Sequence, residues 1–116
     1  MDYTVEYYEK DDGSRPAEEF ILSQDNKMQA KIFKNLELLE IRGNELREPF
    51  SKHIEDGIFE IRNKVGNDIT RIFYFFVIGQ KIILTNGFIK KTQKTPKAEI
   101  ALAKKYRNDY LNREEI

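Results

Sequence analysis

The 116-residue chain contains no cysteine and only one histidine, His53. Without cysteine it cannot form disulfides, thiolate zinc sites, iron–sulfur clusters or a cysteine nucleophile. A single histidine cannot supply a two-histidine relay or a histidine-rich metal site. The sequence also lacks a phosphate-binding loop, a dinucleotide glycine fingerprint and a Gly-x-Ser-x-Gly elbow. These absences argue against the enzyme classes that such motifs define.

Long apolar segments are absent too. No apolar run approaches the roughly 18 residues that a membrane span requires, and the N-terminus has neither the basic start nor the apolar stretch of a signal peptide. We therefore expect a cytoplasmic protein without membrane association. Leu, Ile, Val and Phe account for 33 of the 116 residues, which is enough for one packed core in a single domain spanning residues 1–116.

Charge is distributed unevenly along the chain, although the net charge is zero. Residues 1–60 contain 8 basic and 15 acidic side chains, whereas residues 61–116 contain 12 and 5. A phosphate responds to the local charge of a surface and not to the total. The asymmetry is therefore compatible with two interpretations, an anion-binding face or two solvated surfaces of opposite charge.

Hydrophobic periodicity predicts an α+β fold with an N-terminal strand, two helices, an antiparallel three-strand meander and a C-terminal helix. Caps and turn residues set the expected boundaries. The first half should contain a strand at Tyr3–Tyr8, a helix capped by Ser14 with Pro16 in its first turn, a helix capped by Asp25 or Asn26 that ends near Gly43, and a polar connection from Asn44 to Asp56. The second half should contain strands at Ile58–Val65, Ile69–Ile78 and Lys81–Phe88, two-residue turns at Gly66-Asn67 and Gly79-Gln80, and a helix from Pro96, capped by Thr95, to about Leu111.

The expected turns fix the register of the meander. A two-residue turn at Gly66-Asn67 places Arg62 directly opposite Arg71, with Glu60 on the same face. The second turn places Arg71 opposite Phe88, and Lys90 follows on that face. Like charges facing each other across a ladder are destabilising unless an anion lies between them. Either an anion binds here, or Glu60 neutralises one arginine while the other reaches solvent.

A lysine tract follows the last expected strand and enters a helix N-terminus. Its lysines are Lys90, Lys91, Lys94 and Lys97. The free N–H groups of a helix N-terminus already favour anions, and a bound phosphate backbone would relieve the repulsion among the lysines. A purely solvated loop is the alternative. An isolated histidine such as His53 is more often a surface residue than a catalyst.

Three segments carry the pattern of a known family, namely GIFEIR at 57–62, TRIFYFF at 70–76 and GFIKKTQKTP at 87–96. With them, the stretch from Phe50 to about Tyr110 resembles the phage-derived HigB-like branch of the RelE/ParE toxin superfamily. The resemblance implies a compact RelE-like α+β toxin of a type II toxin–antitoxin pair. Relatives of the RelE and HigB kind cut messenger RNA on the ribosome, without a metal or other cofactor.

The resemblance also implies roles for individual residues. Arginine has a rigid fork of donors and a permanent charge, which suits it to phosphoryl oxygens; Arg71 would stabilise the developing charge there and Arg62 would position the RNA backbone. Lys90 or Lys91 would assist the leaving oxygen. Glu60 and His53 are candidates for the general base. Some relatives have a histidine or tyrosine near the chain end for proton transfer, and at that place this sequence has only Tyr106 and Tyr110. Expected RNA contacts are Lys94, Lys97 and the Lys52-His53 pair in the loop before the meander.

The expected partners are a cognate antitoxin of the helix-turn-helix type and messenger RNA on the ribosome. Operator DNA would be reached only through the antitoxin. Two other functions are compatible with the superfamily. One is a gyrase inhibitor of the ParE type, which would tolerate loss of the basic strand residues. The other is a non-catalytic relative that acts through antitoxin and operator binding.

Overall fold

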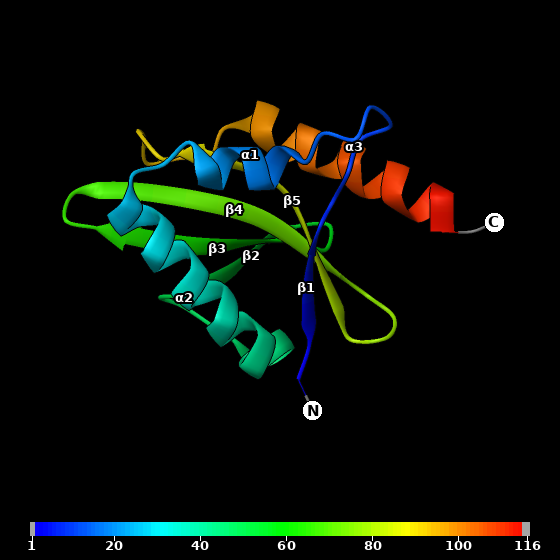
Figure 1. Ribbon diagram of the computed structural model, residues 1–116, viewed down its shortest axis with the longest axis horizontal. Coiled ribbons are helices and arrows are strands. Elements are labelled where there is room, and N and C mark those ends of the chain that lie inside the picture. Colours follow the sequence, from blue (N-terminus) through cyan, green and yellow to red (C-terminus); the bar gives the residue numbers. More distant parts are fainter. Residues whose placement is uncertain (1, 115–116) are drawn as a thin grey trace.

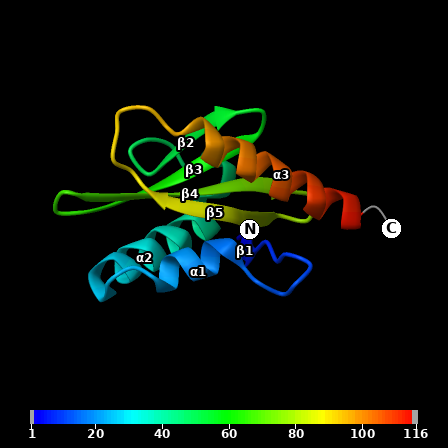
Figure 2. The same cartoon turned by 90° about the horizontal axis from the view of Figure 1, so that it is seen from above.

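The structure, a computed structural model, describes residues 2–114. It has three layers, in which a five-stranded mixed sheet lies between α1 and α2 on one face and α3 on the other (Figures 1 and 2). None of the helices in the described range is long and apolar enough to cross a membrane. In chain order the elements are β1 (Thr4–Tyr7), α1 (Pro16–Leu22), α2 (Asn26–Arg42), the short 3₁₀ helix η1 (Gly43–Glu45), β2 (Ser51–Glu55), β3 (Ile58–Val65), β4 (Asp68–Val77), β5 (Lys81–Ile89) and α3 (Lys97–Glu114).

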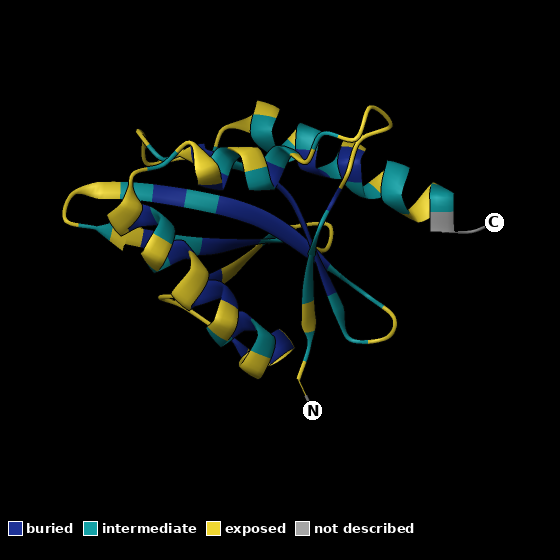
Figure 3. Cartoon of the chain, viewed as in Figure 1, coloured by how far each residue is buried: buried dark blue, intermediate teal, exposed yellow. Residues whose placement is uncertain are grey.

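The strand order is β1-β5-β4-β3-β2. β1 pairs in parallel with β5, and the other neighbouring strands are antiparallel. β4 lies at the centre, and half of its ten residues are buried (Figure 3). Its side chains alternate between the two faces, so that Ile72 and Tyr74 pack toward α1 and α2 while Phe73 and Phe75 pack toward α3. The predicted α+β class is confirmed, as is the prediction that this strand is not at an edge.

β2 corrects the sequence prediction, which placed a polar connection over Asn44–Asp56. The 3₁₀ helix η1 extends into that segment from Gly43, and the edge strand β2 lies within it, so the sheet has one strand more than expected. The strand was missed because Ile54 is the one apolar side chain in it, and an edge strand needs no apolar alternation. The signal that could have found it is Asp56-Gly57, a typical two-residue hairpin turn. Both residues have positive φ, 51° and 76°, and Glu55 pairs with Ile58 across the turn.

Helix starts differ from the predictions at two of three positions. The Ser14 hydroxyl donates to Asp12 at 2.6 Å and does not cap α1, which begins at Pro16. Asp25 does cap α2, because its carboxylate accepts from the N–H of Met28 at 2.8 Å. α3 begins at Lys97, one residue later than expected, and continues to Glu114. Thr95 is therefore not its cap; its hydroxyl lies 3.5 Å from Lys90 Nζ.

The β4–β5 hairpin reaches the predicted register by an unexpected route. The Gly79-Gln80 turn has three residues, because Val77 pairs with Lys81. This shifts the register by one, and a bulge in β5 shifts it back, since Thr85 and Asn86 together lie opposite Phe73. Beyond the bulge Arg71 pairs with Phe88, as predicted. The bulge also places Leu84 and Phe88 on opposite faces, although residues four apart share a face in a regular strand.

Candidate functional site

Two arginines and one buried glutamate form the centre of the site. Arg62 and Arg71 are register partners on β3 and β4, as predicted. The Glu60 carboxylate lies between them, with Oε2 2.8 Å from Arg62 Nε and 3.2 Å from Arg71 Nε. Glu60 is only 1% exposed. A buried carboxylate requires positive partners, and strand alternation brings both arginines to it.

The two guanidinium groups are held differently. Arg62 also contacts Glu48 through Nη1 at 3.0 Å, and Glu48 is largely exposed. Arg71 is the more buried of the two, and its Nη1 donates to the Thr70 carbonyl at 3.3 Å. Burial lowers the pKa of Arg71, and the nearby positive charge of Arg62 acts in the same direction, whereas Glu60 opposes them. Within the described residues no hydrogen bond involves Nη2 of Arg62 or of Arg71. Both arginines therefore retain donors for a ligand.

Two lysines extend this charge on the same face. Lys52 lies on β2 directly opposite Glu60, not in a loop as predicted. Lys90 follows Phe88 by two residues, and its N–H donates to the Ile69 carbonyl at 2.8 Å. Burial lowers the pKa of Lys90, and the positive charges of Arg71, Arg62 and Lys52 lower it further, against the effect of Glu60. We refer to Lys52, Arg62, Arg71 and Lys90 around Glu60 as the basic cluster.

Aromatic residues support the cluster from the α3 side of the sheet. The rings of Phe73 and Phe88 lie 5.3 Å apart between centroids, and both side chains are buried. They belong to the core that α3 covers. Phe88, which the sequence placed opposite Arg71, therefore forms with Phe73 a packed base for the two strands, and neither ring is open to a ligand.

The structure does not bring every predicted site residue into the cluster. Lys91, Lys94 and Lys97 are exposed on and just after the segment joining β5 to α3, and they form no ion pair with any residue between 2 and 114. His53 points to the other face of the sheet, where its ring lies 4.9 Å from that of Phe59. Its Nε2 accepts from the Gly57 N–H at 3.2 Å.

The two tyrosines near the chain end are packed into the α3 core. The Tyr106 ring stacks on Tyr8 with 4.7 Å between centroids. The Tyr110 ring meets Phe75 edge-on at 5.8 Å. Both partners lie away from the Arg62–Arg71 pair along the sheet, so neither tyrosine belongs to the basic cluster.

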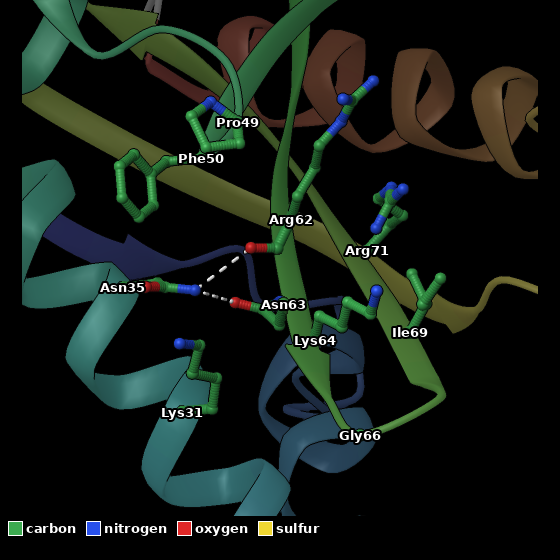
Figure 4. A pocket seen from close by; sticks show the side chains of 10 residues that line it. All are labelled: Lys31, Asn35, Pro49, Phe50, Arg62, Asn63, Lys64, Gly66, Ile69 and Arg71. Carbon is green, nitrogen blue, oxygen red and sulfur yellow. Dashed lines mark hydrogen bonds between the residues drawn. The ribbon is translucent and has the colours of Figure 1, made fainter.

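A hollow of about 530 Å³ opens beside the basic cluster, between α2 and the edge of β3 (Figure 4). Lys31 and Asn35 approach it from α2, and the Asn35 side chain donates to the Arg62 carbonyl at 3.0 Å and to Asn63 Oδ1 at 2.9 Å. Lys64 could have been found from the sequence, because it follows Arg62 by two residues on one strand. The α2 residues could not, since only tertiary packing places them here. The hollow is lined by Lys31, Asn35, Pro49, Phe50, Arg62, Asn63, Lys64, Gly66, Ile69 and Arg71.

A family model matches most of the chain. The model of a family described as "Phage derived protein Gp49-like (DUF891)" matches residues 19–108. This range extends from α1 into α3 and includes the basic cluster and the hollow. No curated protein matches the chain.

Proposed function

The chain belongs to the Gp49-like family of phage-derived proteins, a RelE/HigB-like toxin family, and we propose that it is the endoribonuclease toxin of a type II toxin–antitoxin pair. Its substrate would be messenger RNA on the ribosome, cut without a metal. The observation that supports this proposal most strongly is the basic cluster. Four cations surround one buried carboxylate, and this excess of positive charge suits a phosphate that gains negative charge during reaction.

The proposed reaction uses the RNA's own 2′-hydroxyl as the nucleophile. Its oxygen attacks the adjacent phosphorus while the bond from phosphorus to the 5′-oxygen breaks, leaving a cyclic phosphate and a 5′-hydroxyl. The 2′-hydroxyl loses a proton and the leaving oxygen gains one. The protein must hold the three reacting atoms in line, stabilise charge on the phosphoryl oxygens and assist proton transfer.

Arg71 is the residue we assign to charge stabilisation, because it is partly buried and retains free donors beside Glu60. Arg62 would position the RNA backbone from the neighbouring strand. Glu60 has its Oε2 against both arginines, and its Oε1 is buried without a hydrogen-bond partner in residues 2–114. This environment supports a positioning role, in which Glu60 orients the two guanidinium groups, over the role of general base.

Lys90 is the candidate for protonating the leaving oxygen. An unperturbed lysine has a pKa of about 10.4 and is a poor donor at neutral pH. The lowered pKa of Lys90 moves it toward the useful range. Lys91 is exposed and fits RNA binding or a supporting role, together with Lys94, Lys97 and Lys52. His53 lies on the other face of the sheet and would contact RNA only if the RNA strand passes around the β2 edge.

Partners follow from the same proposal. A helix-turn-helix antitoxin would bind the toxin and reduce its RNA affinity, and operator DNA would be bound through that antitoxin. The protein alone should have modest activity, because arginine and lysine side chains are poor proton donors at neutral pH. The ribosome would add to the rate by holding the messenger RNA in the reactive geometry.

A reconstituted translation system tests the proposal. A defined messenger RNA is incubated with wild type, Arg71→Ala or Arg15→Ala, with and without ribosomes, and cuts are mapped by primer extension. Arg15→Ala is the control because Arg15 is an exposed arginine that pairs with Glu9, outside the cluster. We expect ribosome-dependent cuts with wild type and the control, and none with Arg71→Ala. Intact RNA with all three folded proteins would overturn the proposal, and a gyrase supercoiling assay would then be the next experiment.

A further inference from the structure

The hollow between α2 and β3 has a one-sided charge. Lys31, Lys64, Arg62 and Arg71 line it, and none of the acidic side chains that the structure describes does so. Arg62 and Arg71 also belong to the basic cluster, so the hollow and the cluster are continuous. A ligand that carries several negative charges in a row can therefore occupy both at once.

Asn63 gives a second and independent indication of a ligand. Its side chain is fully buried in the wall of the hollow, and its Oδ1 accepts from Asn35. Its Nδ2 has no hydrogen-bond partner in the described chain. A buried donor without a partner is unfavourable, and an acceptor that enters the hollow would satisfy it.

Phe50 adds an aromatic surface to the hollow. Phe50 is 39% exposed, unlike Phe73 and Phe88, which are buried beneath the basic cluster. The Phe50 carbonyl accepts from the N–H of Arg62 at 2.8 Å, so the residue is fixed relative to the cluster. Exposed aromatic rings beside positive charges are typical of sites that stack nucleic-acid bases.

We propose that this hollow is a nucleotide subsite that binds the residue of single-stranded RNA next to the cleaved bond. A phosphate of the RNA would lie between Lys31 and Lys64, where the RNA backbone crosses the edge of β3. The base would stack on Phe50, with a polar atom on its edge accepting from Asn63 Nδ2. The inference rests on the proposed function. RNA fits better than an acidic protein segment because the hollow offers a ring for stacking and shares two arginines with the cluster.

Binding of short single-stranded RNA to the isolated protein tests the subsite. Each 2′-hydroxyl of the RNA is replaced by a 2′-fluoro group, so that no 2′-oxygen is available to attack the phosphorus and the strand cannot be cut. Fluorescence anisotropy gives Kd over a range of salt concentrations. The variants are Lys31→Ala/Lys64→Ala and Phe50→Ala. The control is Lys10→Ala/Lys105→Ala, which removes the same charge from a different hollow, beside Tyr8.

Loss of one phosphate contact should reduce the slope of log Kd against log salt by about 0.7. We expect this in Lys31→Ala/Lys64→Ala and not in the control. Phe50→Ala should weaken binding about tenfold at every salt concentration, because stacking is not a charge effect. Phe50→Trp should restore it. If Lys31→Ala/Lys64→Ala and Phe50→Ala, the two hollow variants, both keep the wild-type Kd and salt slope, the subsite proposal is overturned.

Side-chain amide resonances of Asn63 provide a readout that folding defects do not imitate. Bound RNA should shift them in the wild type. If a glutamate-rich peptide shifts them and RNA does not, the hollow binds a protein segment and the proposal is wrong. The two proposals fail in different ways. A wild-type protein that binds RNA but never cuts it contradicts the nuclease proposal. A wild-type protein that cuts RNA, together with hollow variants that bind RNA as tightly as wild type, contradicts only the subsite proposal.

Discussion

Arg62 on β3 and Arg71 on β4 are direct cross-strand partners, and both contact the same oxygen of Glu60. Two like charges at such positions repel each other, and one carboxylate compensates for only one of them. The three side chains together carry one excess positive charge. The resting protein thus keeps two guanidinium groups oriented, and an incoming phosphate completes the charge balance.

Replacing Glu60 with glutamine removes the charge that holds the two arginines together. We expect Glu60→Gln to lower the free energy of unfolding by about 1–3 kcal/mol, because two charge-assisted contacts are weakened in a buried place. Urea unfolding followed by circular dichroism measures the change. Glu48→Gln is the matched control, since Glu48 contacts the same Arg62 from an exposed position; it should cost less than about 0.5 kcal/mol. Equal effects of the two variants would contradict this account.

Arg71→Lys separates charge from geometry. Lysine keeps the positive charge but lacks the planar fork of donors. We expect the rate of ribosome-dependent cleavage to fall about 100-fold, a loss typical of removing one transition-state donor. The thermal midpoint serves as the folding control and should stay within a few degrees of wild type. A rate close to that of wild type would show that charge alone is sufficient at this position.

Lys90→Met tests the lowered pKa of Lys90. In the folded protein the charged form is disfavoured, so wild type carries an energetic penalty below the folded pKa. That penalty disappears as the pH rises from the folded pKa toward the unfolded value of about 10.4. Lys90→Met should therefore be stabilised relative to wild type at neutral pH, and the difference should shrink at alkaline pH. Urea midpoints of the two proteins across pH measure it, and a difference independent of pH would contradict the prediction.

Ser51 and Tyr74 form a buried hydroxyl pair that joins β2 to β4. Burial raises the pKa of Tyr74 to about 12, so the hydroxyl stays protonated and is available to donate. Tyr74→Phe or Ser51→Ala alone leaves one buried hydroxyl without its partner and should cost about 1–3 kcal/mol. The double variant should cost less than the sum of the two. Strict additivity in the unfolding free energies would show that the hydroxyls do not interact.

Gly87 is required for close packing of α1 on the sheet. An added Cβ would lie 2.4 Å from a ring carbon of Phe20. Gly87→Ala should therefore destabilise the protein by about 1–3 kcal/mol through overpacking. Adding Phe20→Leu should recover part of the loss, because it removes the ring that clashes. If the second change lowers the urea midpoint further, the close contact is not the cause.

The sequence was sufficient for the centre of the site because strand alternation and one well-defined turn determine it. Gly66-Asn67 is a true two-residue turn, with Val65 paired to Asp68, so Arg62 and Arg71 meet as predicted. The pairing of Arg71 with Phe88 was also predicted correctly, but it depends on a bulge that compensates for a longer turn. The register near that turn was consequently wrong by one residue.

Other parts of the site depend on contacts between distant segments. Lys52 was assigned to a loop because a polar edge strand has no apolar pattern to reveal it. Lys31 and Asn35 lie on α2, where Asn35 is buried on the side that faces the sheet. Nothing in the local sequence shows that either side chain borders the arginines. The pKa shifts of Arg71 and Lys90 could not be predicted either, because they arise mainly from burial and residue spacing does not determine burial.

The unequal charge of the two halves has a consequence for the chain before it folds. In the structure, cations of the basic half pair with acids of the acidic half. Besides the pairs that Arg62 and Arg71 form with Glu48 and Glu60, these are Lys81 with Glu6, Lys104 with Glu55, Arg107 with Asp56 and Arg113 with Asp11. In the unfolded ensemble the same halves attract each other whenever they come within the screening length of about 8–10 Å. The order of charges along the sequence therefore favours collapse of residues 61–116 onto residues 1–60 before any strand has formed, and dissolved salt should slow that collapse.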